Sequence, residues 1–200
     1  LISPCSLLMQ WPGSYFDTKQ IHCYPKTGKP ATEFMIQGLW PHNFDNTYPS
    51  NCSPHSPYNP SKISDLLSRM QKSWPSFSCP SSNGSSLWSH EWEQYGTCSG
   101  LDQTRYFKSA LDLRDHINLF HTLKNAGIKP DGKLYSTFSI SEAIRGVVGY
   151  IPGIMCNSDA SGIRQLHQIY ICIDPSASKA IDCPGLPDGQ CASEIKFSSF

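Results

Sequence analysis

The chain has 200 residues, a formal net charge of zero and a sequence pI near 7.1. This length is enough to bury a hydrophobic core, and we expect one domain over residues 1–200. A neutral chain has no overall attraction to a polyanion, so its surface as a whole is not expected to bind nucleic acid by neutralising phosphates. A local basic patch is still compatible with this charge. No run of about eighteen apolar residues occurs, so no transmembrane helix is predicted.

Nine cysteines without a C-x-x-C pair indicate disulfides formed in an oxidising compartment rather than a zinc site, and we expect no metal and no cofactor. Two N-glycosylation motifs, at Asn51 and Asn83, agree with the secretory pathway, although such motifs also occur by chance. Because the chain starts at Leu1 rather than Met, we expect that any signal peptide has been removed. The predicted location is the vacuole or the extracellular space.

In the first forty residues, two apolar runs alternate with turn residues. Residues 7–11 read as a strand that enters a turn at Pro12-Gly13, and residues 26–30 read as a second turn. Residues 34–39 then read as a buried strand.

The segment over residues 41–60 is rich in Pro, Asn and Ser and has no period, so we expect a loop held by Cys52. A helix should follow, with Asn59 as its cap and Pro60 in its first turn. Its apolar face is predicted to consist of Ile63, Leu66, Leu67, Met70 and Trp74.

The second half of the chain carries two helical patterns and two strand patterns. Residues 103–126 predict one helix that ends at Gly127, and Ser139 with Glu142 predicts a capping box for a helix through Val148. Residues 166–173 predict a central strand and residues 194–197 a final strand. The predicted fold class is α+β, with helices packed on an antiparallel sheet.

A further short helix is predicted in the run WSHEWEQYGTC over residues 88–98, capped by Ser85 or Ser86 and ended by Gly96. Its polar side chains are expected to form one patch on the face turned away from Trp88 and Trp92. These side chains are those of His90, Glu91, Gln94 and Tyr95.

Two segments resemble the active-site segments of the ribonuclease T2 family, and most of all those of plant S-like RNases. Residues 34–41, FMIQGLWP, match the family pattern [FI]-x-I-H-G-L-W-P except that Gln37 stands in place of histidine. Residues 90–98 match H-E-x-x-K-H-G-x-C, with Gln94 in place of lysine and Tyr95 in place of histidine. The resemblance extends from QWPGSY at residues 10–15 to the end of the chain, and it implies the disulfide-stapled fold of that family.

The resemblance also implies a disulfide pattern. The implied pairs are Cys23–Cys79, Cys52–Cys98, Cys156–Cys191 and Cys172–Cys183. Cys5 then remains as a buried thiol or as a link to another chain, so the protein is expected to be a monomer or a Cys5-linked dimer without an obligate protein partner. Phe16 and His22 stand where plant members carry one more bridge.

Cleavage of RNA through its own 2′-hydroxyl needs a base, an acid and a cation to stabilise the phosphorane. The resemblance assigns the acid and base to the positions of Gln37 and Tyr95. An amide transfers no proton, and a phenol is a poor base at neutral or acidic pH. Since each positioned acid or base contributes about 10²–10⁴ in rate, the two replacements predict a severe loss of catalysis, and Gln94 also lacks the charge of lysine.

The retained residues admit two interpretations. His90 and Glu91 are a remnant of a phosphate-binding pair or are held by structural hydrogen bonds, and Gln10 is a base-binding residue or a glutamine at a sheet edge. The substrate-binding remnant implied by the resemblance is Gln10, Trp40, Leu87 and His90. The remaining histidines are expected on loops or helix surfaces, and these are His22, His42, His55, His116, His121 and His167.

Three functions follow as hypotheses. The favoured one is a protein without enzymatic activity that serves as a root or rhizome storage protein, as the resemblance to silent relatives of S-like RNases implies. The second is a weak RNase that works with His90 and Glu91 and releases 2′,3′-cyclic phosphates. The third is a protein that binds nucleotides or RNA without cleavage, including a role in defence.

Overall fold

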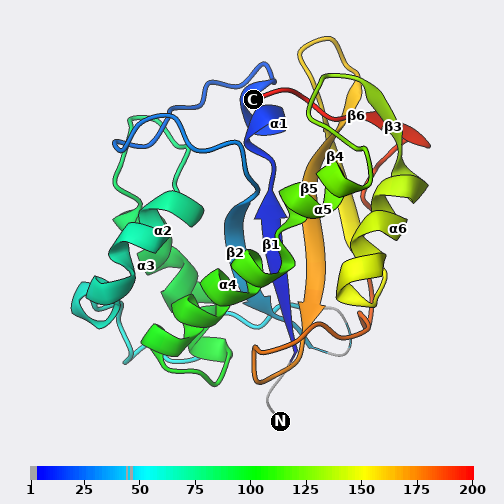
Figure 1. The fold of residues 1–200 in the computed structure, drawn as a ribbon. Helices are drawn as coiled ribbons and strands as arrows, with labels where there is room; N and C mark the ends of the chain where they lie inside the picture. The colour runs from blue at the N-terminus through cyan, green and yellow to red at the C-terminus, as the bar shows by residue number, and fades with distance from the viewer. Residues whose placement is uncertain (1–3, 44, 46) are drawn as a thin grey trace.

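The computed structural model describes residues 4–43, 45 and 47–200, and it shows helices packed against a twisted sheet (Figure 1). Positions 1–3, 44 and 46, the last two within the predicted loop, lie outside the described residues. The strands are β1 (Cys5–Gln10), β2 (Met35–Pro41), β3 (Leu134–Ser136), β4 (Gly153–Ser158), β5 (Arg164–Ile173) and β6 (Glu194–Lys196). The α-helices are α1 (Pro12–Phe16), α2 (Leu67–Ser73), α3 (Ser85–Gln94), α4 (Gln103–Ile117), α5 (Leu119–Asn125) and α6 (Thr137–Val148), with 3₁₀ turns η1 (Pro60–Leu66) and η2 (Gly96–Cys98).

The sheet has the strand order β2-β1-β5-β6-β3, and β4 pairs with β5. Strand β1 lies between β2 and β5 and is antiparallel to both. Strand β5 pairs with β1, β4 and β6, so it is central as predicted. The predicted α+β class is confirmed. One contact departs from the antiparallel pattern, since β5 and β6 pair in parallel through Gln165 and Lys196. The three residues of β3 are too few to show a period of two in the sequence.

One face of the sheet forms the hydrophobic core with the helices. From β1, the side chains of Cys5, Leu7 and Met9 belong to this core, and Trp11 follows them. The helices α4, α5 and α6 cross in front of the sheet (Figure 1), and their buried apolar residues include Tyr106, Phe107, Leu111, Leu123, Ile140 and Ile144. Alternation along β1 directs Leu8 and Gln10 to the opposite face, where the polar residues described below gather.

The N-terminal elements differ from the prediction in their bounds. Residues 12–16 form the short helix α1 rather than a turn, because Pro12 occupies the first helical turn, where its missing N–H is not needed. The predicted cap at Asn59 is confirmed, with its side chain accepting a hydrogen bond from the Ser61 N–H at 3.0 Å. Leu67 was wrongly assigned to the buried face. It is 42% exposed, because the preceding turn is 3₁₀ and shifts the following side chains around the axis.

The predicted helix over residues 103–126 is broken into α4 and α5. Asn118 adopts the left-handed conformation, with φ of 41°, and its side chain caps α5 by accepting from the His121 N–H at 3.1 Å. Asparagine tolerates this conformation better than most residues, so the break occurs without a glycine. The capping box at Ser139 was also wrong, since Ser136 caps α6. Likewise Gly84, and not Ser85 or Ser86, is the N-cap of α3.

Four disulfides tie the loops to this framework, and they are the pairs that the resemblance implies. They are Cys23–Cys79, Cys52–Cys98, Cys156–Cys191 and Cys172–Cys183. Cys5 is a buried free thiol in β1. At the position of the missing bridge, the rings of Phe16 and His22 lie 6.1 Å apart in an edge contact. Among the described residues, no helix is both long and apolar enough to cross a membrane.

Candidate functional site

Helix α3 turns one carboxylate inward. Trp88, Glu91 and Trp92 are all buried, and they lie three and four residues apart on one helical face that Tyr95 extends. The expected polar patch opposite the tryptophans is therefore wrong for Glu91 and Tyr95, because a spacing of three, four and seven residues returns to the same face. The indole N–H of Trp88 donates to the Trp74 carbonyl at 2.8 Å and fixes the helix in place.

The centre of the candidate site is the contact between Glu91 and Trp40. The Trp40 Nε1–H donates to Glu91 Oε2 at 2.9 Å, and the carboxylate is only 4% exposed. Burial raises the pKa of Glu91 from 4.5 to about 7, an effect that the Trp40 hydrogen bond partly opposes. Gly38 lies beneath this contact, where a Cβ atom would stand 2.8 Å from Glu91 Oε2 and 2.1 Å from Trp40 Nε1. The glycine of the QGLW motif thus makes room for the carboxylate.

Two further residues of α3 and its end surround this carboxylate. The ring of Tyr95 stacks on Trp40, with centroids 5.0 Å apart, and the exposed ring of His90 lies 6.4 Å from Tyr95. Burial and then the charge of Glu91 raise the pKa of Tyr95 above its usual value of 10. The phenol therefore stays protonated at neutral pH and is a poor base there.

Gln37 is held by a chain of side chains that sequence patterns did not identify. The Gln168 amide Nε2–H donates to Gln37 Oε1, and the Tyr170 hydroxyl donates to Gln168 Oε1 at 3.5 Å. Both partners belong to β5, which lies next to β1 rather than next to β2. Strand order decides this contact, and no sequence pattern singles out Gln168, because Arg164, Gln165 and His167 of the same strand are also polar.

Gln94, at the position of the family lysine, is engaged outside the Glu91 contact. Its Nε2–H donates to Asn51 Oδ1 at 3.1 Å, and Asn51 Nδ2–H donates back to Gln94 Oε1 at 3.4 Å. The Asn51 backbone N–H also donates to the Gln94 carbonyl at 2.9 Å. The disulfide between Cys52 and Cys98 holds the two segments together. Both ends of the Gln94 amide are therefore occupied by an exposed asparagine.

The remaining expected site residues are placed as follows. Gln10 is not at a sheet edge, because β1 lies between two strands. Its side chain is 5% exposed, and Gln10 Oε1 has no hydrogen-bond partner among the described residues. Leu87 is half-buried against the core near the start of α3. Asn51 and Asn83, which carry the two N-glycosylation motifs, are exposed.

One histidine, His167, was wrongly assigned to loops or helix surfaces. His42 lies in the loop after β2, as expected, but it is buried and only 3% exposed. His167 lies within β5 and lines a pocket with His22 and Tyr15. Burial and then the charge of His22 lower the pKa of His167 from 6.5 to about 4, so its imidazole is neutral at physiological pH.

Comparison with known proteins identifies the same family as the two motifs. The model of the Ribonuclease T2 family matches residues 5–183. Extracellular ribonuclease LE of Solanum lycopersicum is 55% identical, over 96% of this chain and 85% of that protein. The crystal structure of RNase NT in complex with 5′-AMP has a TM-score of 0.97 and 47% identity, and each chain is covered completely. A ribonuclease-like storage protein of Panax ginseng is 30% identical, over 90% of this chain and 74% of that protein.

These comparisons correct the expectation that the protein is not an enzyme. Its relatives at high identity are named ribonucleases, whereas the relative named as a storage protein shares fewer residues. The replacement of two histidines by Gln37 and Tyr95 therefore does not justify removing the chain from the class of enzymes. The motif comparison also did not show that Glu91 is buried and that burial raises its pKa to about 7.

Proposed function

Because the chain belongs to the ribonuclease T2 family, we propose that it is a slow ribonuclease that binds RNA at Trp40 and Glu91 and cleaves it through a 2′,3′-cyclic phosphate. The observation that carries this proposal is the buried carboxyl of Glu91, whose pKa is about 7. A group that titrates near the working pH can both hold and release a proton during a reaction. The 5′-AMP bound by RNase NT supports nucleotide binding by the related cleft of this chain.

The chemistry can be assigned to the residues present. The 2′-oxygen attacks phosphorus, the bond from phosphorus to the 5′-oxygen breaks, and the 2′-hydroxyl proton passes to the exposed imidazole of His90. Protonated Glu91 donates a proton to the leaving 5′-oxygen and becomes a carboxylate. The Tyr95 hydroxyl donates a hydrogen bond to the phosphoryl oxygens. No lysine charge is present at Gln94, so the stabilisation of the phosphorane is weaker than in a site with that cation.

The proposal is tested by RNA digestion with purified, mass-verified protein from pH 4 to 8. We expect slow release of 2′,3′-cyclic phosphates, at a rate that falls about tenfold per pH unit above the pKa of Glu91, near pH 7, because the proton donor is then lost. Glu91→Gln should lower the rate by about 10²-fold and remove this decline, since a glutamine amide does not titrate.

His90→Ala should also lower the rate by about 10²-fold, since the base is lost. His121→Ala, which changes an exposed histidine on α5, is the matched control and should leave the rate unchanged. Equal rates for the parent protein, Glu91→Gln and His90→Ala would show that any RNA cleavage comes from a contaminant and would reject the proposal.

A second role, as a storage protein of the secretory pathway, is favoured by the 30% identity to the Panax ginseng storage protein. Four disulfides and a buried core suit a protein that accumulates in an oxidising compartment. Quantitative proteomics of the source tissue tests this role. Massive accumulation in vacuoles that declines during regrowth is the expected result, and trace abundance in every tissue would exclude it.

A further inference from the structure

An extra residue in β2 turns the side chain of Gln37 away from the hydrophobic core. Ile36 and Leu39 both belong to the core, although they are three residues apart in a strand. The pairing of β2 with β1 shifts between Ile36 and Gly38, which leaves Gln37 without a partner in β1. An extra residue of this kind is a β-bulge, and it makes Gln37 and Gly38 point to the same side of the sheet. Gln37 therefore lies on the face that carries Gly38 and the carboxylate contact above it.

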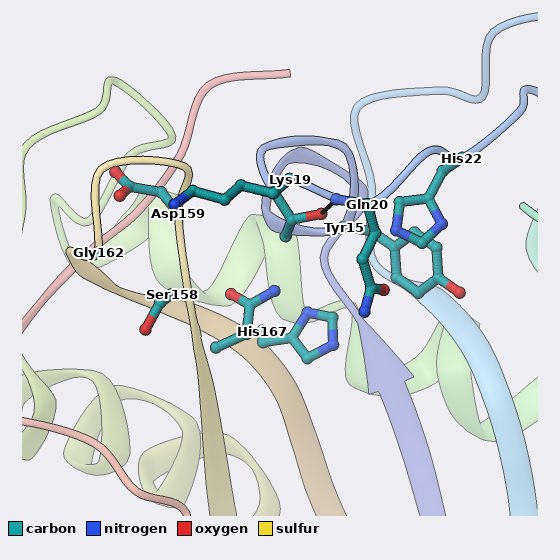
Figure 2. Close-up of a pocket in the computed structure, with 10 residues that line it drawn as sticks. Tyr15, Lys19, Gln20, His22, Ser158, Asp159, Gly162 and His167 are labelled. Atoms are coloured by element: carbon teal, nitrogen blue, oxygen red, sulfur yellow. Dashed lines mark hydrogen bonds between the residues drawn. The ribbon is translucent and has the colours of Figure 1, made fainter.

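A second extra residue, in β5, turns Gln168 to the same face. Leu166 and Ile169 are both core residues three positions apart, and the pairing of β5 with β4 shifts between Leu166 and Gln168. His167 is the inserted residue, so His167 and Gln168 both point away from the core. Figure 2 shows the ring of His167 in a pocket that Tyr15 also lines, and the two ring centroids lie 5.9 Å apart. Gln168 follows directly after this histidine.

The two glutamine side chains meet across β1. Because β1 lies between β2 and β5, these outer strands are separated by two strand spacings, or roughly 10 Å, which two glutamine side chains together can span. The Gln168 Nε2–H donates to Gln37 Oε1. The Tyr170 hydroxyl donates to Gln168 Oε1 at 3.5 Å, and burial raises the pKa of Tyr170 to about 12, so the hydroxyl keeps its proton. Each amide oxygen in this chain is thus occupied by a donor.

These contacts decide which end of the Gln37 amide is free to bind a ligand. Gln37 Oε1 is occupied, whereas Gln37 Nε2 has no hydrogen-bond partner among the described residues, and the side chain is only half-buried. The backbone is fixed as well, because the Trp74 Nε1–H donates to the Gln37 carbonyl at 3.2 Å. An amide nitrogen offers N–H donors and no acceptor, so its ligand must supply acceptor atoms.

The neighbouring groups favour a phosphate over a nucleobase as this ligand. A base edge carries both donors and acceptors, whereas a phosphodiester carries acceptor oxygens only. The Glu91 carboxyl is neutral below its pKa of about 7 and does not repel an anion at acidic pH. Gln94 brings no positive charge, and both ends of its amide are paired with Asn51. A phosphate in this cleft therefore needs a further donor, and Gln37 Nε2 supplies one.

We propose that Gln168 and Tyr170 are positioning residues, which hold the Gln37 amide so that its N–H groups donate to a non-bridging oxygen of the scissile phosphate. The inference rests on the proposed function, since it takes the RNA phosphate as the ligand of the cleft. It deepens that function, because it gives the glutamine at position 37 a part in binding the phosphate that needs no proton transfer.

Calorimetric titration at pH 6 with adenosine 3′-phosphate, adenosine and inorganic phosphate tests the inference without any need for cleavage. Gln37→Met should weaken the binding of the nucleotide about tenfold, the loss expected for a hydrogen bond to a charged group. Gln168→Leu should weaken it about threefold or more, because the Gln37 amide then rotates freely, and Tyr170→Phe should weaken it by a smaller factor. Gln71→Leu, at a half-buried glutamine of α2, is the matched control and should bind as the parent protein does. All four variants should bind adenosine as the parent does.

A double-mutant cycle separates positioning from a general structural effect. With Gln37→Met already present, Gln168→Leu should cause no further loss of nucleotide binding, since Gln168 acts through Gln37. If Gln168→Leu does not fold, Tyr170→Phe takes its place in the cycle.

Four results would reject the inference. They are nucleotide binding by Gln37→Met as tight as that of the parent, a loss from Gln168→Leu that persists in the double variant, an equal loss of adenosine binding, and inorganic phosphate bound as tightly as the nucleotide. The expected binding changes in a protein that does not cleave RNA would reject only the catalytic proposal. Unchanged binding by Gln37→Met in a protein that does cleave RNA would reject only the role of the amide.

Discussion

At the scale of single residues, the candidate site is distinguished by which groups are able to move a proton. Gln37 and Tyr95 occupy the two positions at which the family carries histidine, and both are held by neighbours, Gln37 by Gln168 and Tyr95 by stacking on Trp40. Glu91 of α3 keeps the motif residue and accepts the hydrogen bond from Trp40 of β2. In the proposed function, the acid–base steps therefore fall to Glu91 and His90 rather than to residues 37 and 95.

Restoring both imidazoles should restore fast cleavage. We expect Gln37→His with Tyr95→His to raise kcat/KM for RNA by about 10²-fold or more, because each positioned acid or base contributes about 10²–10⁴. Steady-state kinetics on a dinucleoside phosphate provide the measurement, and each single revertant should gain less than the pair. A double revertant that is folded and binds substrate, yet cleaves at the parental rate, would show that the backbone at these positions is unsuited to catalysis.

At the scale of elements, close contacts with backbone decide where side chains are tolerated. Strand β2 must carry glycine at position 38, because Trp40 and Glu91 of α3 close over it. Helix α6 contains Gly146, around which there is open space within 4 Å and no positive φ. The two glycines thus differ in their surroundings although both lie inside regular structure.

We expect Gly38→Ala to lower the free energy of unfolding by about 1–3 kcal/mol and to displace Glu91, because the added methyl group overlaps the Trp40–Glu91 hydrogen bond. Gly146→Ala is the matched control and should stabilise the protein by about 0.5–1 kcal/mol through its helix propensity. Urea unfolding with fluorescence detection measures both changes. Equal effects of the two substitutions would contradict the tight fit at Gly38.

The junction of α4 and α5 depends on the backbone conformation and the side-chain cap of Asn118. Asn118→Ala should cost about 1–3 kcal/mol, because it removes the cap to His121 and places a Cβ-bearing residue without local hydrogen bonds at φ of 41°. Asn118→Gly should cost only a few tenths of a kcal/mol, since glycine adopts this conformation freely. Urea unfolding again provides the measurement, and a larger loss for Gly than for Ala would exclude this account of the break.

At the scale of the whole molecule, Glu91 and His167 give the free energy of unfolding opposite dependences on pH. Glu91 has its folded pKa raised from 4.5 to about 7, so the folded state keeps a proton that the unfolded state releases, and stability falls as pH rises through this window. His167 has its folded pKa lowered from 6.5 to about 4, so the unfolded state binds the extra proton, and stability falls as pH drops through that window.

Substitution should separate these two effects. Relative to the parent protein, Glu91→Gln should become more stable as pH rises from 4.5 to 7, by up to about 3 kcal/mol at neutral pH. The reason is that Gln takes up no proton on folding, while it can still accept a hydrogen bond from Trp40. His167→Leu should gain relative stability as pH falls from 6.5 to 4. Melting temperatures across pH 4–8 check both, and parallel curves for all three proteins would contradict the assignments.

The sequence alone determined the family, the α+β class, the cap at Asn59 and the positions of the retained and replaced active-site residues, because these depend on local patterns and motif spacing. It did not place Glu91 on the buried face, join Gln37 to Gln168, or bring His167 beside Tyr15 and His22. Those contacts depend on strand order, on an inserted residue in β5 and on the packing of α3 over Gly38. Burial and neighbouring groups set a pKa, so only the tertiary structure could identify Glu91 as a buried carboxyl whose pKa is raised to about 7.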